Sequence, residues 1–571
     1  MATAEQNAGV PERTKQGEKK EKKVKNDMKE NAKKAKHAPS KKIEGAAMIG
    51  IDVAKEENLA DWYAQVLRKG DMISYYDISG CYILEPPSYA IWENIQAWFN
   101  KKIKSIGVRN AYFPIFISEA NLKREEQHLE GFAAEVAWVT HGGKEKLAQR
   151  IAIRPTSETA MYGHFATKIR SHNDLPLKLN QWNNVVRWEF KNPMPFIRSR
   201  EFLWQEGHTA HLTKEEATKE VLQILDWYAG IYEYLLAVPV VKGVKTTAEK
   251  FPGAEFTTTI EGFIPSTGRG IQAGTSHCLG QHFSKMFNIT VEDPVLSESG
   301  EKRPPIHVWQ NSWGLTTRSI GVMILTHGDN QGLVIPPRVA EVQVVIIPVG
   351  VTNKTSAEDK QKLYKEAEAI AEVLREADVR VQVDLRDQYT TGWKFNDWEL
   401  KGVPLRIEFG PKDSEKHVVT TARRDQASQK TKGTVQISQL GTDIPALLEE
   451  MQADMLKKAD EEYRSHRKVI KDWAEFVPAL NAKNVCLIPH CLDEDAEGKD
   501  QGGKCEDHIK EISARKDTGD EMAVDAKAPS MGAKSLCIPY EQPEDISEGT
   551  KCLNPDCQNM AKKWVMFGRS Y

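Results

Sequence analysis

The chain has 571 residues, of which 40% are apolar and 28% charged, and its formal net charge is −3. These values are typical of a soluble globular chain with roughly three or four domains. No run of about 18 uncharged apolar residues occurs, so we expect no transmembrane helix. The first residues include no apolar segment of the kind found in secretory signals, so we expect no such signal. The eight cysteines argue against a disulfide framework in a chain of this length and leave metal binding open.

The small net charge conceals a basic N-terminal segment. Between Arg13 and Lys42, thirteen Lys or Arg stand against four Asp or Glu, a net of +9, which leaves −12 for the rest of the chain. The segment has almost no large apolar residue, so we predict that residues 1–46 are disordered or form a transient helix. Such a segment is either a solubilising extension or an electrostatic arm that raises the affinity for RNA without reading its sequence.

The folded part is predicted to begin near Met48. Residues 58–69 have the pattern of an amphipathic helix, and in residues 88–106 apolar side chains again recur at helical spacing. A strand is expected over residues 110–117. Because Pro114 in its middle cannot donate a ladder hydrogen bond, this strand should lie at a sheet edge or an interface.

Two stretches place polar side chains where strands end. Residues 151–158 (IAIRPTSE) predict a short strand whose polar end either contacts a ligand or caps a helix over 159–169. Residues 183–211 predict two strands joined by a proline-containing turn. We expect this hairpin to project six side chains from one small surface: Arg187, Glu189, Arg198, Arg200, Glu206 and His208. Arginines buried so close together need anions, and a phosphate-rich ligand would supply them.

A predicted helix over residues 214–234 is followed by a glycine-rich block. That block, residues 262–287, carries Gln272, Thr275 and His277. Glycines allow the backbone to approach a ligand closely. A histidine in such a setting is more often structural than functional, so the residues alone leave its role open.

Residues 311–325 begin polar and continue as an apolar helix with Thr316 and Arg318 at its start. An arginine at the amino end of a helix adds charge where the macrodipole is already positive. This arrangement is unfavourable unless an anion binds there, so the pattern favours a phosphate site.

After residue 336 the pattern changes to alternating strands and helices, over 342–347, 356–377, 379–384, 393–401 and 405–409. This alternation predicts a mixed sheet with helices on its faces. Five basic residues there either meet phosphates and guanine edges or are solvated surface: Lys394, Arg406, Lys412, Arg423 and Arg424.

A long charged helix, expected over residues 445–475, leads to a last domain with six cysteines. Tetrahedral zinc needs four ligands, usually in two close pairs, and four of these cysteines are candidates: Cys491, Cys505, Cys552 and Cys557. The first pair is widely spaced, so spacing alone leaves zinc binding open. We read Cys537 as a core residue.

Several of these blocks resemble the three motifs of class II aminoacyl-tRNA synthetases. Arg187-x-Glu189 followed by Arg198-x-x-x-Phe202 resembles motif 2, and residues 314–318 resemble motif 3. The helix and strand with the central proline resemble motif 1, which builds the dimer interface in that family. The resemblance implies an antiparallel catalytic sheet flanked by helices.

Three further strings narrow the resemblance to class IIa prolyl-tRNA synthetases: RPTSE at 154–158, GTSHCLGQHFSKMF at 274–287 and the terminal GRSY. About a hundred residues separate motif 2 from motif 3, which leaves no room for the large editing insertion of bacterial-type enzymes. The resemblance is therefore to the eukaryotic/archaeal type.

The fold expected from this resemblance is a multi-domain α/β protein. After the basic extension of residues 1–46, it has a class II catalytic domain (47–335) and a mixed α/β anticodon-binding domain (336–445). A small zinc-binding α/β domain (446–571) ends the chain.

The resemblance also assigns roles to residues. For proline it implies Thr156, Glu158, Arg187, Trp204, His208, Phe251 and His277. For ATP it implies Arg187, Glu189, Arg198, Phe202, Gln272, Thr275, Thr316 and Arg318, with Arg187 and Arg318 as catalytic residues. A secondary ammonium has two N–H donors, which Thr156 and Glu158 would accept. Without this context, Trp204 and Phe251 would be read as core residues.

We therefore expect a cytoplasmic homodimer without membrane contact that ligates L-proline to tRNA(Pro) with ATP and Mg²⁺. The resemblance implies structural Zn²⁺ on Cys491, Cys505, Cys552 and Cys557. A threonyl or other class IIa enzyme is the first alternative, disfavoured because the aromatic pocket suits a ring. The second is a catalytically silent relative that only binds RNA or regulates, which the intact motif arginines disfavour.

Overall fold

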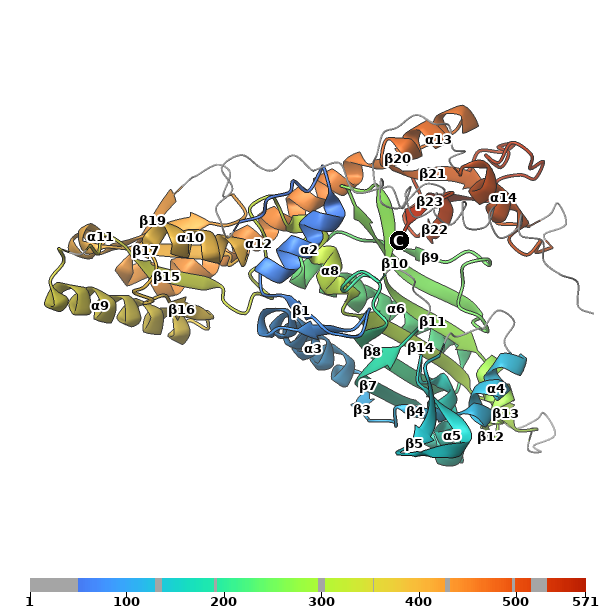
Figure 1. Cartoon of the computed structure of the whole chain (residues 1–571). Helices are drawn as coiled ribbons and strands as arrows, with labels where there is room; N and C mark the ends of the chain where they lie inside the picture. Colours follow the sequence, from blue (N-terminus) through green and yellow to red (C-terminus); the bar gives the residue numbers. More distant parts are fainter. Residues whose placement is uncertain are drawn as a thin grey trace, which may run out of the picture.

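The structure is a computed structural model that describes residues 50–128, 136–188, 193–295, 303–352, 354–426, 432–494, 499–514 and 531–571. The basic extension and Glu189 therefore lie outside the described residues. Figure 1 shows a central sheet with a second α/β unit on one side and a smaller C-terminal unit on the other. No helix in the described ranges is long and apolar enough to cross a membrane.

The central sheet is mainly antiparallel and carries the predicted hairpin at its middle. Strand β7 (Leu177–Val186) pairs with β8 (Glu201–His211), and β8 pairs in turn with β14 (Trp309–Thr316). Beyond β14 follow β11 (Arg269–Gly280), β10 (Phe256–Ile264) and β9 (Val241–Val244). The expected antiparallel sheet is confirmed, although β7 ends at Val186 and so leaves Arg187 just beyond the strand.

Helices bury one face of this sheet. They are α2 (Leu59–Lys69), α3 (Pro86–Ser105), α6 (Lys214–Gly230) and α8 (Arg318–His327). Their apolar faces form one large core in which Trp92, Phe99 and Tyr228 are at most 1% exposed. The predicted helix over 214–234 is confirmed, although its last turn, Ile231–Leu235, is π-helical. The opposite face of the sheet carries the cavity described below.

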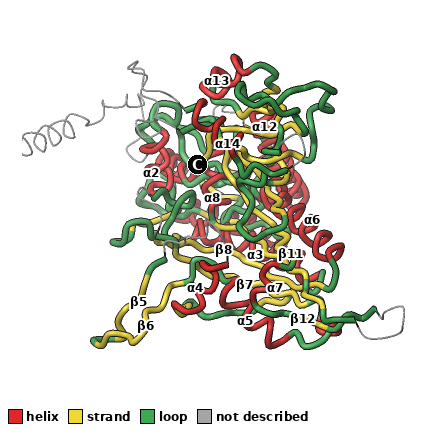
Figure 2. Tube along the Cα trace, turned by 90° about the vertical axis from the view of Figure 1, so that its right-hand side faces the viewer, coloured by secondary structure: helices red, strands yellow, loops and turns green. Residues whose placement is uncertain are grey.

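The expected strand with Pro114 at its middle is interrupted. The structure has two short strands instead, β3 (Arg109–Asn110) and β4 (Phe116–Ser118). A proline cannot donate to a ladder, so the pairing stops on either side of it. Both pieces lie at sheet edges, as predicted: β3 ends the central sheet, and β4 ends a small sheet with β6 (Glu145–Ile153) and β5 (Trp138–Gly142). Figure 2 shows β5 and β6 projecting from the body of the molecule.

The second unit is the predicted mixed α/β domain. Its sheet has the order β16 (Val381–Val383), β15 (Val344–Pro348), β17 (Leu405–Phe409), β18 (Val418–Arg423) and β19 (Lys432–Gln436). Helices α9 (Ala357–Glu376) and α12 (Leu440–Ser465) share a core with this sheet, and α10 (Thr391–Leu400) contacts β15.

Most of the basic residues expected in this domain either to contact RNA or to be solvated surface have internal partners instead. Lys394 is buried and donates to the backbone of Asp384, whereas Arg406 pairs with Glu399 and Glu408. Arg423 and Arg424 are held by carboxylates in the same way; Arg424 makes a bidentate pair with Asp329, just beyond α8 of the catalytic domain. Among the five, Lys412 is exposed.

The C-terminal unit joins the catalytic sheet, which the sequence did not indicate. Strand β22 (Lys534–Pro539) pairs with β9, and the last strand, β23 (Lys563–Ser570), pairs with β11. Strands β21 (Val485–His490) and β20 (Arg467–Val469) complete a single sheet of eleven strands.

The long charged helix is shorter than predicted. It is α12 and ends at Ser465, and a separate helix α13 (Trp473–Asn481) follows β20. Cys537 is fully buried, as expected of a core residue.

Candidate active site

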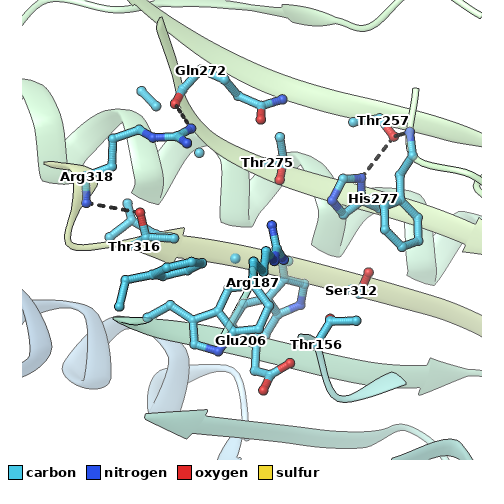
Figure 3. A pocket seen from close by; sticks show the side chains of 18 of the residues that line it. Thr156, Arg187, Glu206, Thr257, Gln272, Thr275, His277, Ser312, Thr316 and Arg318 are labelled. Atoms are coloured by element: carbon cyan, nitrogen blue, oxygen red, sulfur yellow. Dashed lines mark hydrogen bonds between the residues drawn. The ribbon is translucent and has the colours of Figure 1, made fainter. Parts of the chain in front are cut away.

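One cavity of about 360 Å³ opens over strands β8, β11 and β14. Its lining contains every residue that the sequence assigned to proline or ATP, apart from Glu189, which is not described. These residues are Thr156, Glu158, Arg187, Arg198, Phe202, Trp204, His208, Phe251, Gln272, Thr275, His277, Thr316 and Arg318. Figure 3 shows Arg318 and Thr316 at one end of the cavity and His277 and Thr257 at the other. The structure thus brings the predicted site together, and the role of each residue stays a prediction.

The Arg318 end of the cavity holds a cation whose guanidinium donates to backbone carbonyls. The Nε of Arg318 donates to Ile197 O and one terminal nitrogen donates to Gln272 O, each at 3.1 Å. Within the described part of the chain no carboxylate lies at ion-pair distance from Arg318. Burial lowers the pKa of Arg318, and the nearby cations Arg198 and Arg187 lower it further, against opposing effects of Tyr232 and Glu261. Polar carbonyls fix this guanidinium, and its charge favours an anionic ligand.

Arg187 lies between the cationic end and the aromatic side chains. Its Nε donates to Pro155 O at 3.1 Å. Its guanidinium carbon lies 5.6 Å from the ring centre of Phe202 and 5.5 Å from that of Trp204. Contact with two rings and a carbonyl holds the side chain in place before a ligand arrives.

The other end of the cavity has an aromatic wall. The rings of Phe251 and His277 lie 4.8 Å apart, and Thr257 Oγ1 lies 2.9 Å from His277 Nδ1 (Figure 3). Burial lowers the pKa of His277 to about 3, so this imidazole is neutral at physiological pH. These side chains offer a flat apolar wall, which suits a small saturated ring.

The acceptors predicted for an ammonium group lie where α5 (Glu158–Lys168) begins. Thr156 and Glu158 are 8% and 4% exposed, and the Thr156 hydroxyl donates to Glu158. A carboxylate has about four lone-pair sites, so beside this hydroxyl Glu158 keeps acceptor capacity for a charged donor. The strand-end segment therefore both starts the helix and lines the cavity.

Glu206 also lines the cavity, although its place on the predicted hairpin indicated no role for it. Its Oε1 accepts hydrogen bonds from Ser157, Gln181 and Asn183, and its Oε2 lies 3.1 Å from His208 Nε2. Burial raises the pKa of Glu206, but these hydrogen bonds and His208 outweigh it, and the net shift is downward. An ionised Glu206 orients His208. The alternation of Trp204, Glu206 and His208 along β8 was the signal that could have identified it.

Ser312 is a second lining residue that the sequence did not identify. It lies directly opposite His208 on β8 and opposite His277 on β11. Only the strand register reveals this position, and no pattern within residues 311–325 indicates it.

Arg200, which the sequence grouped with the hairpin arginines, is not among the cavity residues. It donates to Ser79 O at 3.0 Å, and its guanidinium lies 4.6 Å from the Trp188 ring centre. Arg200 precedes β8, and these two contacts hold its side chain outside the cavity lining.

The four candidate cysteines of the C-terminal unit lie close together despite their spacing. The Sγ atoms of Cys505 and Cys552 are 3.7 Å apart, as are those of Cys491 and Cys557. Four thiolates at about 2.3 Å from a tetrahedral zinc lie about 3.8 Å from one another, and both of these separations match that spacing. Asn554 donates to Cys505 Sγ at 3.1 Å, the type of support common around bound metals.

His490 lies beside this cluster, with its ring nitrogen within 4.8 Å of the sulfur atoms of Cys491, Cys505 and Cys552. The Leu492 N–H donates to His490 Nδ1 at 3.0 Å. Burial lowers the pKa of His490, and the proton of the neutral ring is then on Nε2. A protonated nitrogen is not a metal ligand, so the four cysteines are the better donor set.

An antiparallel sheet with an arginine hairpin, followed by a strand–helix unit that begins at Arg318, is the core of a class II aminoacyl-tRNA synthetase. Three family models agree. The class II core domain of tRNA synthetases (G, H, P, S and T) matches residues 138–327, an anticodon-binding domain matches 343–447, and the prolyl-tRNA synthetase C-terminal domain matches 473–571.

Curated relatives extend this match over most of the chain. A putative proline–tRNA ligase of Saccharomyces cerevisiae is 57% identical over 93% of this chain and 74% of its own length. The cytoplasmic proline–tRNA ligase of Arabidopsis thaliana is 51% identical over 92% of this chain and 91% of its own. The solved prolyl-tRNA synthetase of Cryptosporidium parvum with L-proline and AMP is 50% identical, covers 92% of this chain and 100% of its own, and has a TM-score of 0.79. The chain belongs to the prolyl-tRNA synthetase family.

Proposed function

We propose that this chain is a proline–tRNA ligase that activates proline with ATP and transfers it to tRNA(Pro). One observation supports this function most strongly: a single cavity joins a cationic end to an end with an aromatic wall. The first end suits the phosphates of ATP and the second the ring of proline. A threonine site would need partners for a hydroxyl in place of this aromatic wall.

The first step joins the two ends of the cavity. The proline carboxylate attacks the α-phosphorus of ATP; the new C–O–P linkage forms as pyrophosphate leaves with the electrons of the broken P–O bond. The nucleophile is already ionised, so the step needs positioning and charge neutralisation. Arg187, between the two ends, would bridge the carboxylate and the α-phosphate, while Arg198 and Arg318 would hold the γ-phosphate. In the second step the terminal tRNA hydroxyl takes the prolyl group and AMP leaves.

The remaining assignments follow from the same placement. Phe202 would stack on the adenine, and Gln272, Thr275 and Thr316 line the nucleotide end. The described lining residues near Arg318 offer no carboxylate for Mg²⁺, which favours an ion held by phosphate oxygens and water. Glu189, predicted to accept from the adenine amino group, lies outside the described residues.

Zinc is proposed for the C-terminal unit, held by Cys491, Cys505, Cys552 and Cys557. The separations within the pairs Cys505–Cys552 and Cys491–Cys557 support a tetrahedral site. Bound there, the ion would supply folding free energy to the domain and no chemistry to the distant reaction.

A homodimer is supported by exposed apolar side chains around the motif 1 region. They come from the β1–β2 hairpin (Ile73–Tyr75 and Tyr82–Leu84), the start of α3 and the segment around Pro114: Tyr75, Tyr76, Ile78, Ile83, Tyr89, Tyr112 and Phe116, between 40% and 72% exposed. Large apolar side chains exposed on these segments favour an interaction surface. The cytoplasm is the proposed compartment, in line with the Arabidopsis relative's name.

Charging of tRNA with a panel of amino acids tests the proposal. Purified protein, ATP and an unfractionated tRNA pool should yield prolyl-tRNA at least about 10² times more efficiently than alanyl- or threonyl-tRNA. Charging with threonine in preference to proline would indicate another class IIa activity. Binding of tRNA without charging by any amino acid would indicate the silent relative.

A further inference from the structure

The segment between β9 and β10 connects the C-terminal unit with the active-site cavity. Residues 249–252 of this segment line the cavity, and Phe251 forms the wall next to His277. The residues just before them contact β22 and α14 (Lys504–Ile512) of the C-terminal unit. One short stretch of backbone therefore touches both.

Thr246 is the centre of the C-terminal contact. Its Oγ1 donates to Glu506 Oε2 at 3.0 Å and lies 3.0 Å from Ser535 Oγ. Ser535 also donates to Glu506. All three residues are buried, with exposures of 4%, 3% and 7% for Thr246, Ser535 and Glu506. A buried three-membered network of this kind is specific in geometry and costly to leave incomplete.

Contacts on both sides of Thr246 hold the same segment. Lys245 Nζ donates to Leu536 O at 2.7 Å, and Lys534 Nζ lies 3.4 Å from Glu249 Oε1. Gly503 has a φ of +80°, and a Cβ on it would lie 2.8 Å from the Cβ of Ala248. The C-terminal unit therefore fixes the whole approach to the cavity wall.

Backbone hydrogen bonds carry this placement to Phe251. Thr246 O accepts from the N–H of Glu249 at 3.2 Å and from that of Lys250 at 2.9 Å. Phe251 N then donates to Thr257 Oγ1 at 3.0 Å, the same hydroxyl that contacts His277. A shift of Thr246 would move the turn and, with it, the aromatic wall.

We propose that Glu506, with Thr246 and Ser535, is a positioning residue that sets the Phe251 wall and so the discrimination between proline and smaller amino acids. This inference rests on the proposed function. Glu506 does not touch the substrate; it acts through Thr246 and the turn that follows. Proline fills the cavity up to the wall, whereas alanine lacks the ring carbons that would reach it.

Thr246→Val tests the link, because valine keeps the shape and removes the hydroxyl. We expect its KM for proline to rise about tenfold, the effect of removing roughly one methylene group from the wall, with KM for ATP and for alanine changed less than about twofold. The proline-over-alanine ratio of kcat/KM should fall by the same factor. Thr246→Ser, which keeps the hydroxyl, should restore wild-type selectivity. Glu506→Gln, which keeps one acceptor oxygen, should fall between the two.

A matched control is Glu511→Ala, a substitution of an exposed residue on the same helix, which should leave every constant unchanged. Equal losses for proline, alanine and ATP in Thr246→Val, with reduced metal content or thermal stability, would make the network a purely structural bond and overturn the proposal. If Thr246→Val does not fold, unchanged selectivity in Glu506→Gln would overturn it equally. A wild-type protein that fails to activate proline would refute the proposed function instead.

Discussion

Replacing Arg318 by Met tests the assignment of the cationic end. Two backbone carbonyls hold the guanidinium, and no carboxylate in the described part of the chain lies at ion-pair distance from it. A cation about 4 Å from a phosphate oxygen, at an effective dielectric constant of about 20, contributes about 4 kcal/mol, and removal of one such clamp in known enzymes costs about 3–4 kcal/mol. We therefore expect kcat/KM for ATP in proline-dependent pyrophosphate exchange to fall by about 10² to 10³.

The fold should survive this change. Arg318 is half-buried and has no carboxylate partner among the described residues. Removal of its charge therefore recovers part of the desolvation cost, which offsets the loss of two hydrogen bonds, so the melting temperature should stay within about 5 °C of wild type. Proline binding without ATP, followed by calorimetry, should be unchanged. A kcat/KM for ATP within tenfold of wild type would show that Arg318 is not a phosphate ligand.

Four other changes probe separate parts of the molecule. Phe251→Ala should reduce kcat/KM for proline about tenfold more than that for alanine in pyrophosphate exchange; equal losses would make Phe251 a structural residue. Cys552→Ser should release zinc and destabilise the C-terminal unit, and a wild-type protein without zinc by elemental analysis would end this hypothesis. Deletion of residues 1–42 should leave adenylate formation unchanged. It should reduce the slope of the logarithm of the tRNA binding constant against the logarithm of salt concentration by about 0.7–0.9 for each phosphate that the segment neutralises, and an unchanged slope would exclude an RNA-binding arm. Burial raises the pKa of Glu220, but pairing with His211 and Lys178 outweighs it and lowers the pKa to about 2. The ionised carboxylate therefore contributes about 3 kcal/mol to the free energy of unfolding above pH 4.5, and this contribution is lost as the pH falls through 2. Acid titration of Glu220→Gln should show a shallower loss of stability than wild type, and parallel curves would contradict the pairing.

The cavity residues could be predicted because their identities and short-range spacing carry the signal. Arg187, Arg198 and Arg318 stand in patterns that need an anion whatever the surrounding fold, and all three line one cavity. Glu206 could also have been found, because strand alternation places it beside His208. Ser312 could not, since its place depends on the register between β14 and its two neighbours.

Long-range pairing explains the other gaps. The strands of the C-terminal unit join β9 and β11 across more than 200 residues of sequence, and no local pattern encodes that pairing. The basic residues of the second domain look exposed by composition, yet Arg424 is neutralised by Asp329, a carboxylate that only the fold brings near. Cys491 and Cys505 look too widely spaced for one site, but the fold brings both into one cluster with Cys552.

Proline-dependent exchange of pyrophosphate into ATP by the purified full-length chain is the decisive measurement for the proposed activity. The joined cationic and aromatic ends of the cavity predict robust exchange with proline and weaker, measurable exchange with alanine. Alanine fits any pocket that proline fills, and it binds more weakly only because it does not contact the aromatic wall. No exchange with proline, or threonine-dependent exchange that exceeds it, would contradict the proposed activity.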